Sequence, residues 1–444
     1  MLEVQKNCHE LGVNELTGHL KQGTLGLRDY VAAMQNYAQA VDPEVKAFAH
    51  HSKEIVDLQT ERLESLRNSG APLPRLFGVP IAVKDNIDTE DYPTEYGFEG
   101  SRGRTPSVDA FLVHKLREAG ALVWAKSRTT ELAYMQPTIT ENPRAPGYTP
   151  GGSSSGSAAA VACGLVPAAV GTQTNGSVIR PASFCGVYGY KPSRGLIFNG
   201  GVLACSPSLD QVGVFARSVE DLASVAEVMI GGHQLDSGQL IFPMGLREVC
   251  EQDPPLPPKL MFANTPMWDR VDPRSQRAFQ ELKEELKDCM VEVELPAAVA
   301  NSLIWLKAVM EAEMQLSLKR LVDSVGGNAS LPTLAVIERG SKILAADYLL
   351  ARERMQTAAS GFEEYFDHFD AIVTPAALGP PPQGLLSTGD PVMSSIWTYA
   401  GLPCLSMPML QTEDGLPIGV QLVGAMRNDA RLLRTARWLA QRLG

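Results

Sequence analysis

The segment from Pro150 to Gly176 constrains this chain more than any other. It begins with Gly-Gly-Ser-Ser-Ser-Gly-Ser, carries almost only small side chains from Ala158 to Cys163, and then holds an apolar run from Val166 to Val170. A Gly/Ser tract alone is typical of a flexible linker. The residues that follow favour a folded structure, because a small-residue helix can pack very close to a sheet and a Ser/Gly-rich entry supplies a cap and free amides.

Hydrophobic periodicity predicts an α/β fold around this segment. The short apolar runs Val79 to Val83 and Ala121 to Ala125 are typical of buried strands. Between them, Asp109 is placed to cap a helix that stops at Gly120, which gives a β-α-β unit. Other strands are expected over residues 166–170, 260–262, 370–373 and 418–423, and helices over 13–67, 279–289 and 301–369 with an interruption near 326–332.

Composition and charge exclude several classes of protein. Of the 444 residues, 20% are charged and 44% hydrophobic, which argues against disorder. The net charge of −11 and the lack of a long basic run argue against nucleic acid or a membrane as a partner. No signal peptide or spanning segment is visible, and the seven scattered cysteines indicate free thiols. We therefore expect a cytoplasmic protein.

Motifs that hold metals, phosphates or dinucleotides are missing from the sequence, so we expect no metal and no cofactor. Gly152 to Gly156 does match the Gly-x-Ser-x-Gly elbow of α/β-hydrolases, with Ser154 as the nucleophile and His233 or His368 as the base. That elbow needs a strand directly before it, whereas a Pro-rich loop precedes this one. An α/β-hydrolase esterase therefore stays an alternative.

A second constellation consists of Lys84 at the end of an apolar strand, Ser153 in the serine run, and Ser177. Around these residues the sequence resembles the amidase signature family of serine hydrolases. The matching segments, in family order over most of the chain, are 78–86, 151–157, 171–192, 208–213 and 415–424. The resemblance implies a single α/β/α unit with a large, mixed, twisted sheet that is covered by helices on both faces.

The resemblance also implies one domain over residues 1–444. Its expected parts are a helical lead-in at 1–70, a catalytic core at 71–225, a variable and mostly helical pocket-forming region at 226–395, and C-terminal core elements at 396–444. The sequence does not decide the oligomeric state, although a homodimer is common for soluble enzymes of this size.

Amide hydrolysis requires an activated nucleophile, a site for the oxyanion and a proton for the departing amine. A lysine can activate a serine only when its amine is neutral, which burial and the absence of a close carboxylate favour. The resemblance implies that Ser177 attacks to form an acyl-enzyme and that Lys84 is the base. It also implies that Ser153, preceded by a cis peptide bond, relays the proton between them.

The resemblance places the oxyanion hole at the backbone amides of Thr174, Asn175, Gly176 and Ser177. The family usually has Asp-Thr-Gly-Gly-Ser here, whereas this chain has Gln173-Thr-Asn-Gly-Ser. Asn tolerates unusual backbone angles better than most residues, so the hole can persist.

A second departure concerns the substrate. Arg180 lies three positions after Ser177, whereas most family members have this Arg two positions after the nucleophile. Together with Gln173, this spacing resembles the malonamidase branch, in which the matching Arg holds the substrate's carboxylate. Arg180 can equally be a structural partner of loop carbonyls. We expect a small amide, with a carboxylate near the scissile group, and candidate substrate-binding residues Arg180, Gln173 and Ser154.

Other functions stay open at this stage. One is an aryl or other amidase of the same family. The glutamyl-tRNA amidotransferase A subunit shares the catalytic core but passes ammonia to a partner, and the acidic balance and the altered segment at Ser177 argue mildly against it. Fatty-acid amide hydrolases share the core as well, but no membrane anchor is visible. The last alternative is a binding module without enzymatic activity, which a fluorophosphonate probe would not label.

Overall fold

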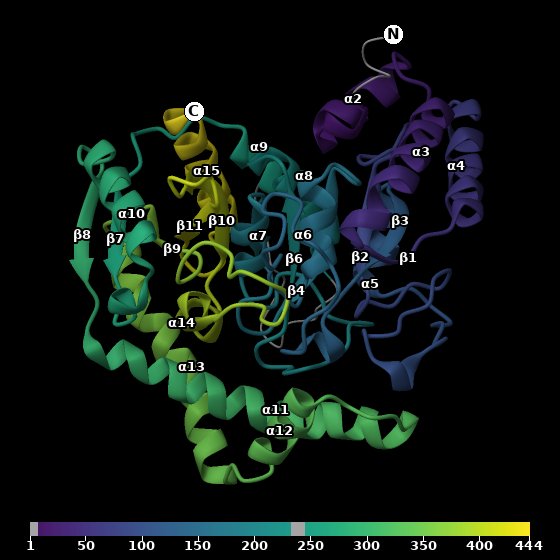
Figure 1. The fold of residues 1–444 in the computed structure, drawn as a ribbon. Helices are drawn as coiled ribbons and strands as arrows, with labels where there is room; N and C mark the ends of the chain where they lie inside the picture. Colours follow the sequence, from purple (N-terminus) through teal and green to yellow (C-terminus); the bar gives the residue numbers. More distant parts are fainter. Residues whose placement is uncertain (1–7, 232–244) are drawn as a thin grey trace.

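The computed structural model describes residues 8–231 and 245–444 (Figure 1). Its strands form one sheet of eleven. From one edge to the other the strands are β1 (Phe48–His50), β3 (Leu122–Ser127), β2 (Pro80–Lys84), β4 (Ala168–Gln173), β6 (Gln211–Ala216), β5 (Tyr188–Lys191), β10 (Cys404–Gln411), β11 (Pro417–Val423), β9 (Ala371–Pro375), β7 (Leu260–Asn264) and β8 (Met290–Glu294).

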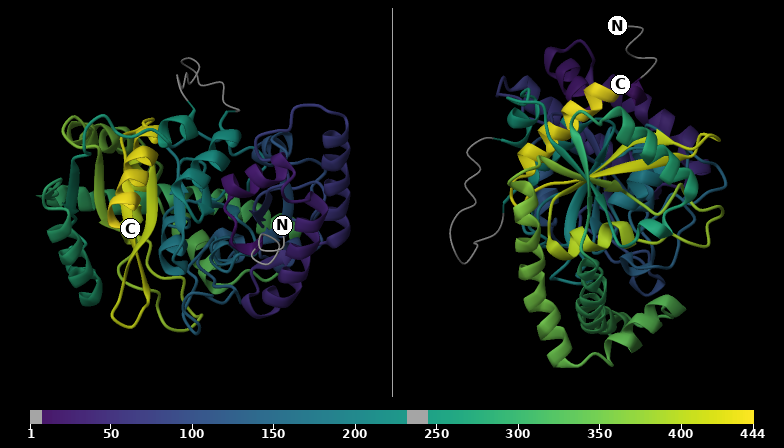
Figure 2. Two further views of the ribbon diagram at one scale, coloured as in Figure 1. Left: turned by 90° about the horizontal axis from the view of Figure 1, so that it is seen from above. Right: turned by 90° about the vertical axis from the view of Figure 1, so that its left-hand side faces the viewer.

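The sheet is mixed, as the sequence predicts. β3, β2 and β4 run parallel, as do β9, β7 and β8, and the remaining neighbours are antiparallel. Figure 2 shows the strands end-on, fanned around a common axis, with helices on both sides. This arrangement confirms the expected α/β architecture with a large twisted sheet.

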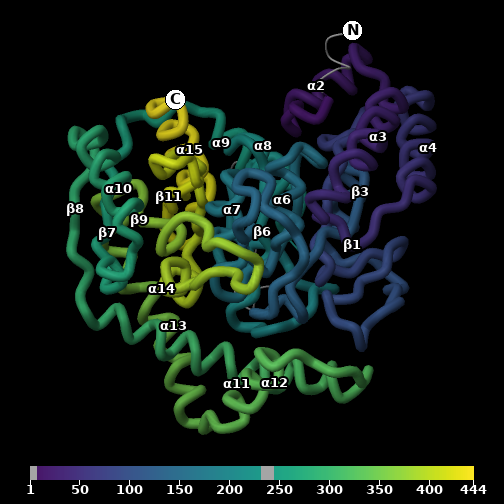
Figure 3. Tube along the Cα trace, viewed as in Figure 1, coloured from purple at the N-terminus to yellow at the C-terminus, as the bar shows by residue number. Residues whose placement is uncertain are grey.

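The helices of the described residues are α2 (Val13–Gln22), α3 (Leu27–Val45), α4 (Lys53–Asn68), α5 (Phe111–Glu118), α6 (Ser155–Ala162), α7 (Ile179–Cys185), α8 (Val219–Met229), α9 (Leu246–Cys250), α10 (Pro273–Glu285), α11 (Asn301–Val325), α12 (Leu331–Gly340), α13 (Ala345–Phe366), α14 (Val392–Ala400) and α15 (Asp429–Leu443). The tube in Figure 3 shows that α2, α3 and α4 lie at the β1 end of the sheet and α10 at the β8 end.

In the described part of the chain no helix is both long and apolar enough to cross a membrane.

Helix α6 shows that the Gly/Ser-rich segment is folded. All its residues from Ser155 to Val161 are buried, and the helix contacts β2, β3 and β4. A Cβ added to Gly156 would lie 2.2 Å from the carbonyl oxygen of Ala47, and one added to Gly171 would lie 2.6 Å from Ser154 Oγ. At both positions neighbouring atoms approach so closely that only glycine fits, which explains the composition that resembled a linker.

Most of the predicted elements are present with small shifts of their ends. The apolar runs became β2, β3, β4, β7, β9 and β11, and the long helical pattern became α11, α12 and α13 with a break at residues 326–330. One local prediction is wrong. Ala110, not Asp109, precedes α5, and the Asp109 carboxylate instead accepts hydrogen bonds from Glu90 N at 2.9 Å and Arg117 Nε at 2.8 Å.

Two of the expected regions contain more sheet than their patterns indicate. The lead-in at 1–70 supplies β1, which pairs with β3 as an edge strand. The region 226–395 supplies β8, which pairs with the expected strand β7 and forms the other edge of the sheet. Helices α11, α12 and α13 of this region lie together below the sheet in Figure 1.

Candidate active site

Lys84 is the last residue of β2, and its position follows from the parallel pairing of β2 with β4. The C-terminal ends of parallel neighbours lie on the same side of a sheet, so Lys84 lies beside the end of β4. Its Nζ is 2.7 Å from Ser153 Oγ and 2.8 Å from Thr172 Oγ1, in hydrogen bonds to both. The structure therefore brings together two of the three residues expected in the catalytic triad.

Burial makes Lys84 suitable as a base. The side chain is completely buried, and this desolvation lowers the pKa of its amine to about 7. Nearby Cys205 and Asp210 raise this pKa, and Arg180 lowers it further, but neither effect equals that of burial. A neutral amine can then accept a proton from a serine hydroxyl at neutral pH.

Ser153 follows a peptide bond, Gly152–Ser153, that is cis as the resemblance implies. The carbonyl oxygen of Gly152 accepts a hydrogen bond from Arg180 Nη2 at 2.6 Å. In the described structure no hydrogen bond joins the Ser153 and Ser177 hydroxyls. A proton relay between them therefore requires the shorter contacts that catalytic groups adopt when substrate is bound.

Ser177 lies at the wall of a cavity, in the segment between β4 and α7. Within the described residues its hydroxyl has no hydrogen-bond partner. The backbone amides of Asn175, Gly176 and Ser177 likewise donate to no other described group. An oxyanion hole needs free backbone amides close to the nucleophile. The free amides and the free Ser177 hydroxyl therefore support the roles expected for this segment.

Gln173 does not face the cavity, which differs from the expectation that it binds substrate. Its Oε1 accepts hydrogen bonds from Val178 N at 2.7 Å and Ile179 N at 3.0 Å, and its Nε2 donates to Thr398 Oγ1 at 2.9 Å. The side chain is completely buried. Gln173 therefore caps the first turn of α7, in the helix that carries Arg180.

Helix α14 holds Asn175 from the opposite side. Thr398 donates a hydrogen bond to the Asn175 carbonyl oxygen at 2.6 Å, and Ser395 donates one to Asn175 Oδ1 at 2.6 Å. Thr398 thus contacts both Gln173 and Asn175, the two positions at which this chain departs from the usual family residues. Helix α14 therefore supplies hydrogen-bond partners for both of these residues.

Ser154 also lies away from the cavity. Its hydroxyl donates to the Thr172 carbonyl oxygen at 3.2 Å and accepts from Thr172 N at 3.3 Å, and the side chain is fully buried against β4. The structure contradicts both roles considered for Ser154, as a substrate-binding residue and as an esterase nucleophile. Of the bases that the esterase would need, His368 is exposed beyond the end of α13 and does not line the cavity, and His233 lies outside the described residues.

Arg180 is a partner of loop carbonyls, which is one of the two roles that were considered for it. Its Nε donates to the Thr388 carbonyl oxygen at 2.6 Å and its Nη2 to the Gly152 carbonyl oxygen, so it holds loop carbonyls. Its Nη1 is buried without a hydrogen-bond partner in the described structure, and Arg180 lines the cavity. Burial lowers the pKa of the guanidinium to about 10, so the group is charged at neutral pH.

The cavity in front of Ser177 has a volume of about 610 Å³. One wall is the α11 face that carries Leu303, Leu306, Met310 and Met314, and Lys307, Glu311 and Arg339 add charged groups. These residues could not be singled out from the sequence. The only signal for the wall was the helical spacing of its apolar residues, which is equally typical of a helix that packs in a core.

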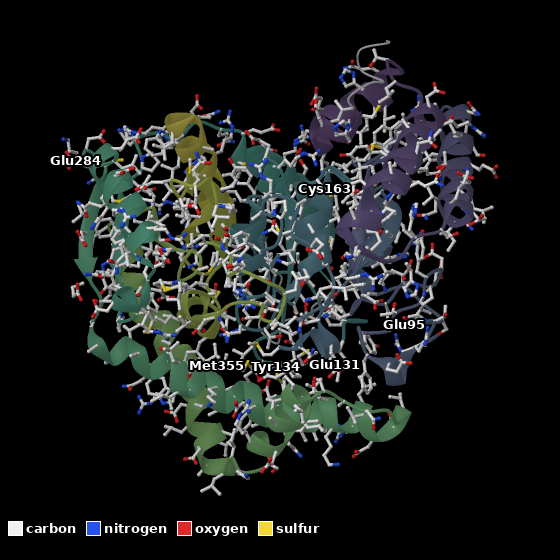
Figure 4. The ribbon with its side chains drawn as sticks, in the orientation of Figure 1. Glu95, Glu131, Tyr134, Cys163, Glu284 and Met355 are labelled. Atoms are coloured by element: carbon white, nitrogen blue, oxygen red, sulfur yellow. The ribbon has the colours of Figure 1, made fainter. Side chains whose placement is uncertain are left out.

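Tyr134 enters the cavity from a loop with unusual backbone angles. Leu132 and Ala133, which precede it, have φ values of 49° and 54°, in a region that side chains other than glycine rarely adopt. Glu131 fixes this loop, because its carboxylate accepts hydrogen bonds from Ser330 N, Ser330 Oγ and Thr333 Oγ1 at the start of α12. Figure 4 shows Glu131 and Tyr134 side by side above α11 and α12.

Charged residues complete this wall. Arg339 Nε donates to Glu311 Oε1 at 2.7 Å, and Arg339 Nη2 donates to the Tyr134 hydroxyl at 3.1 Å.

Among the described residues there is no group of three or more His, Cys, Asp or Glu side chains arranged to hold a metal ion.

The site thus contains a buried lysine that is hydrogen-bonded to a serine after a cis peptide bond, and a second serine, in the cavity wall, whose segment has free backbone amides. The family model named Amidase matches residues 29–433. This chain belongs to the amidase family. Its relatives include the A subunit of a glutamyl-tRNA(Gln) amidotransferase from Picosynechococcus, which is 31% identical over 90% of this chain and 91% of the relative.

Solved structures of the same fold agree with this assignment. One is described as a vestigial protein complex that reveals the evolutionary origins of an s-triazine catabolic enzyme, with 27% identity and a TM-score of 0.88 over 97% of this chain and 98% of the other. Another is the native peptide amidase from Stenotrophomonas maltophilia, with 26% identity and a TM-score of 0.83 over 98% and 97% of the two chains. Like its family, this protein is an amide hydrolase.

Proposed function

We propose that this amidase cleaves a small amide that carries a carboxylate, by way of an acyl-enzyme on Ser177. Lys84 takes a proton from Ser153 as Ser153 takes one from Ser177, and the Ser177 oxygen attacks the carbonyl carbon. The amides of residues 174–177 stabilise the oxyanion. The proton returns through Ser153 to the departing nitrogen, the C–N bond breaks, and water then cleaves the ester to release the acid.

The observation that carries this proposal is the free nitrogen of Arg180. A buried guanidinium nitrogen without a partner costs desolvation free energy that an anionic ligand would recover. A Cβ added to Gly176 would lie only 2.9 Å from Nη1, so this nitrogen lies over the oxyanion segment. A carboxylate bound there would be close to the scissile carbonyl, as it is in the half-amide of a short diacid.

Comparing malonamate with the neutral amide propionamide tests this proposal. We expect wild type to favour malonamate in kcat/KM and Arg180→Gln to lose that preference. Because Arg180 also holds Gly152 and Thr388, the informative quantity is the ratio of the two kcat/KM values in each variant, since a general loss of activity cancels in it. Arg180→Lys keeps the charge and should keep part of the preference. An unchanged ratio in Arg180→Gln would contradict the carboxylate role.

A second candidate is a glutaminase that supplies ammonia to partner subunits. The curated relatives favour it over the first, because several of them, at 27–32% identity, bear the name of the amidotransferase A subunit. The far wall of the cavity also carries both signs of charge, with Arg339 and Lys307 near Glu311. Glutamine has a carboxylate and an ammonium group distant from its amide, so such a wall could bind both.

Ammonia release from glutamine and from malonamate separates the two candidates. A kcat/KM for glutamine that exceeds that for malonamate, and that falls in Arg339→Gln but not in Lys342→Gln, would replace the first candidate by the second. Lys342 is the control because it lies just past α12, in an exposed pair with Glu338. Aryl amides such as acetanilide belong in the same assay, since the apolar wall on α11 offers space for them.

The partners of this chain are also proposals. We propose that it acts on a small molecule without contacting nucleic acid, because its net charge is −11. A tRNA mobility-shift assay at low salt tests this, and a salt-sensitive complex with the isolated chain would contradict it. Location in the cytoplasm and a homodimeric state remain predictions, and light scattering measures the second.

A further inference from the structure

The carboxylate of Asp210 lies directly behind the segment that carries the proposed oxyanion hole. Asp210 is the residue before β6, and its side chain is half-buried. It accepts hydrogen bonds from Thr174 Oγ1 at 2.6 Å, Cys205 N at 2.8 Å and Ser206 N at 2.9 Å. Three donors converge on one carboxylate that does not reach the cavity in front of Ser177.

The bond from Thr174 connects this carboxylate to the active site. Thr174 joins the end of β4 to the amides of residues 175–177. Those amides are backbone groups, so their direction depends on what holds the segment at each end. α14 holds the middle through Thr398 and Asn175, and Asp210 holds the start through the Thr174 hydroxyl. Without the second anchor, the segment can rotate about its junction with β4.

A second carboxylate holds the loop that contains Asp210. Glu313 on α11 accepts hydrogen bonds from Ser206 Oγ at 2.6 Å, Ser208 N at 3.0 Å and the Tyr348 hydroxyl at 2.8 Å. Ser206 therefore donates its amide to Asp210 and its hydroxyl to Glu313. The same helix carries Met310 and Met314 in the cavity wall, so the wall and the loop share one rigid support.

We propose that Asp210 is a positioning residue that aims the oxyanion-hole amides through the Thr174 hydroxyl, with Glu313 fixing its loop to α11. This inference rests on the proposed roles of Ser177 and its segment. Asp210 exchanges no proton with the substrate; besides raising the pKa of Lys84, it acts through the position of the segment that carries the amides. A displacement of catalytic groups by about 1 Å is enough to slow a reaction about 100-fold.

The rate of labelling by a fluorophosphonate probe measures this effect without knowledge of the substrate. Ser177 Oγ bonds to phosphorus, fluoride leaves, the serine proton passes to the base, and the phosphoryl oxygen occupies the oxyanion hole. We expect Thr174→Val, which removes the hydroxyl at nearly constant shape, to slow labelling about 10- to 100-fold. Thr174→Ser keeps the hydroxyl and should restore most of the rate. Malonamate turnover should show the same loss in kcat with little change in KM.

Controls separate positioning from a general loss of structure. Thr60→Val removes another buried threonine hydroxyl, which donates to the Val56 carbonyl oxygen on α4, and should leave the labelling rate unchanged. Adding Asp210→Asn to Thr174→Val should cause little further loss, because both changes break the same bond. Glu313→Gln should slow labelling less than Thr174→Val does.

Two results would overturn the inference in different ways. If wild type is labelled, if Ser177→Ala is not, and if Thr174→Val reacts at the wild-type rate, the positioning role is wrong and the proposed nucleophile stands. If wild type is not labelled at all, the proposed role of Ser177 fails and the inference fails with it.

Discussion

Lys84 Nζ lies 2.7 Å from Ser153 Oγ, although 69 residues separate them in the chain. The contact depends on the packing of α6, which begins two residues after Ser153, against β2. Lys126 and Lys191 are also completely buried, but their amines bond to carbonyl oxygens and to other side chains of the core. Lys84 differs from them because its amine contacts the hydroxyl of Ser153, which follows the cis peptide bond.

The pH dependence of activity should report the pKa of Lys84. Burial lowers this pKa to about 7, and the neutral amine is the active form. We therefore expect kcat/KM to rise with pH through about 7 and to fall about tenfold per pH unit below it. Lys84→Met should lose at least about 100-fold in activity. An acidic limb centred near the ordinary lysine pKa would contradict the role of Lys84 as the base.

Lys191→Met is the matched control for this experiment. Burial lowers the pKa of Lys191 to about 8, and its amine bonds to Gln211 Oε1 and to the carbonyl oxygens of Pro192 and Leu402. Its loss should destabilise the fold but leave the acidic limb of the surviving activity in place. Thermal unfolding measured beside the pH profile distinguishes the two effects.

The three neighbouring serines should respond differently to substitution by alanine. Ser177→Ala should abolish fluorophosphonate labelling, because it removes the proposed nucleophile. Ser153→Ala should slow labelling about 100-fold or more, because it removes the relay from Lys84. Ser154→Ala should retain activity and lose about 1 to 2 kcal/mol of stability, since its hydroxyl bonds only to the Thr172 backbone. A Ser154→Ala variant as inactive as Ser177→Ala would refute this assignment.

Glu131 should hold the N-terminal end of α12 in place. Its carboxylate binds Ser330 and Thr333 at the N-terminus of that helix, where a negative charge is also favoured by the helix dipole. Glu131→Gln should weaken this attachment by about 1 to 2 kcal/mol, so amides of residues 331–340 exchange hydrogen about 5- to 30-fold faster. Glu338→Gln changes an exposed pair on the same helix and should not alter exchange. Equal exchange in both variants would show that Glu131 does not hold α12.

Two glycine substitutions should have opposite effects on stability. A Cβ at Gly156 would collide with the backbone of Ala47 and Arg128, so Gly156→Ala should destabilise the protein by about 3 kcal/mol or more. Gly18 lies within α2 with nothing near its missing Cβ, and Gly18→Ala should stabilise by about 0.5 to 1 kcal/mol. Urea unfolding measures both. A tolerated Gly156→Ala would mean that α6 can move away from the sheet.

Much of the fold could be predicted from the local pattern of apolar residues and turns. The apolar runs at β2, β3 and β7 are short and bounded by turns, and the helical spacing in α10 and α11 is regular. Edge strand β1 has three residues and strand β8 is mostly exposed, so neither has a clear apolar pattern. Strand order was not predictable, because it depends on contacts between residues far apart in the sequence.

The sequence by itself determined the family, and it predicted Lys84, Ser153 and Ser177 as the catalytic residues because they lie in motifs whose order and spacing are distinctive. Only the tertiary structure decided which neighbouring polar groups face the cavity. Ser154 and Gln173 adjoin the site in sequence but turn into the core, where their hydrogen bonds are satisfied by Thr172 and by the first turn of α7. Arg180 keeps one nitrogen free because two loop carbonyls occupy the others. The direction of a side chain follows from such packing, which motifs do not encode.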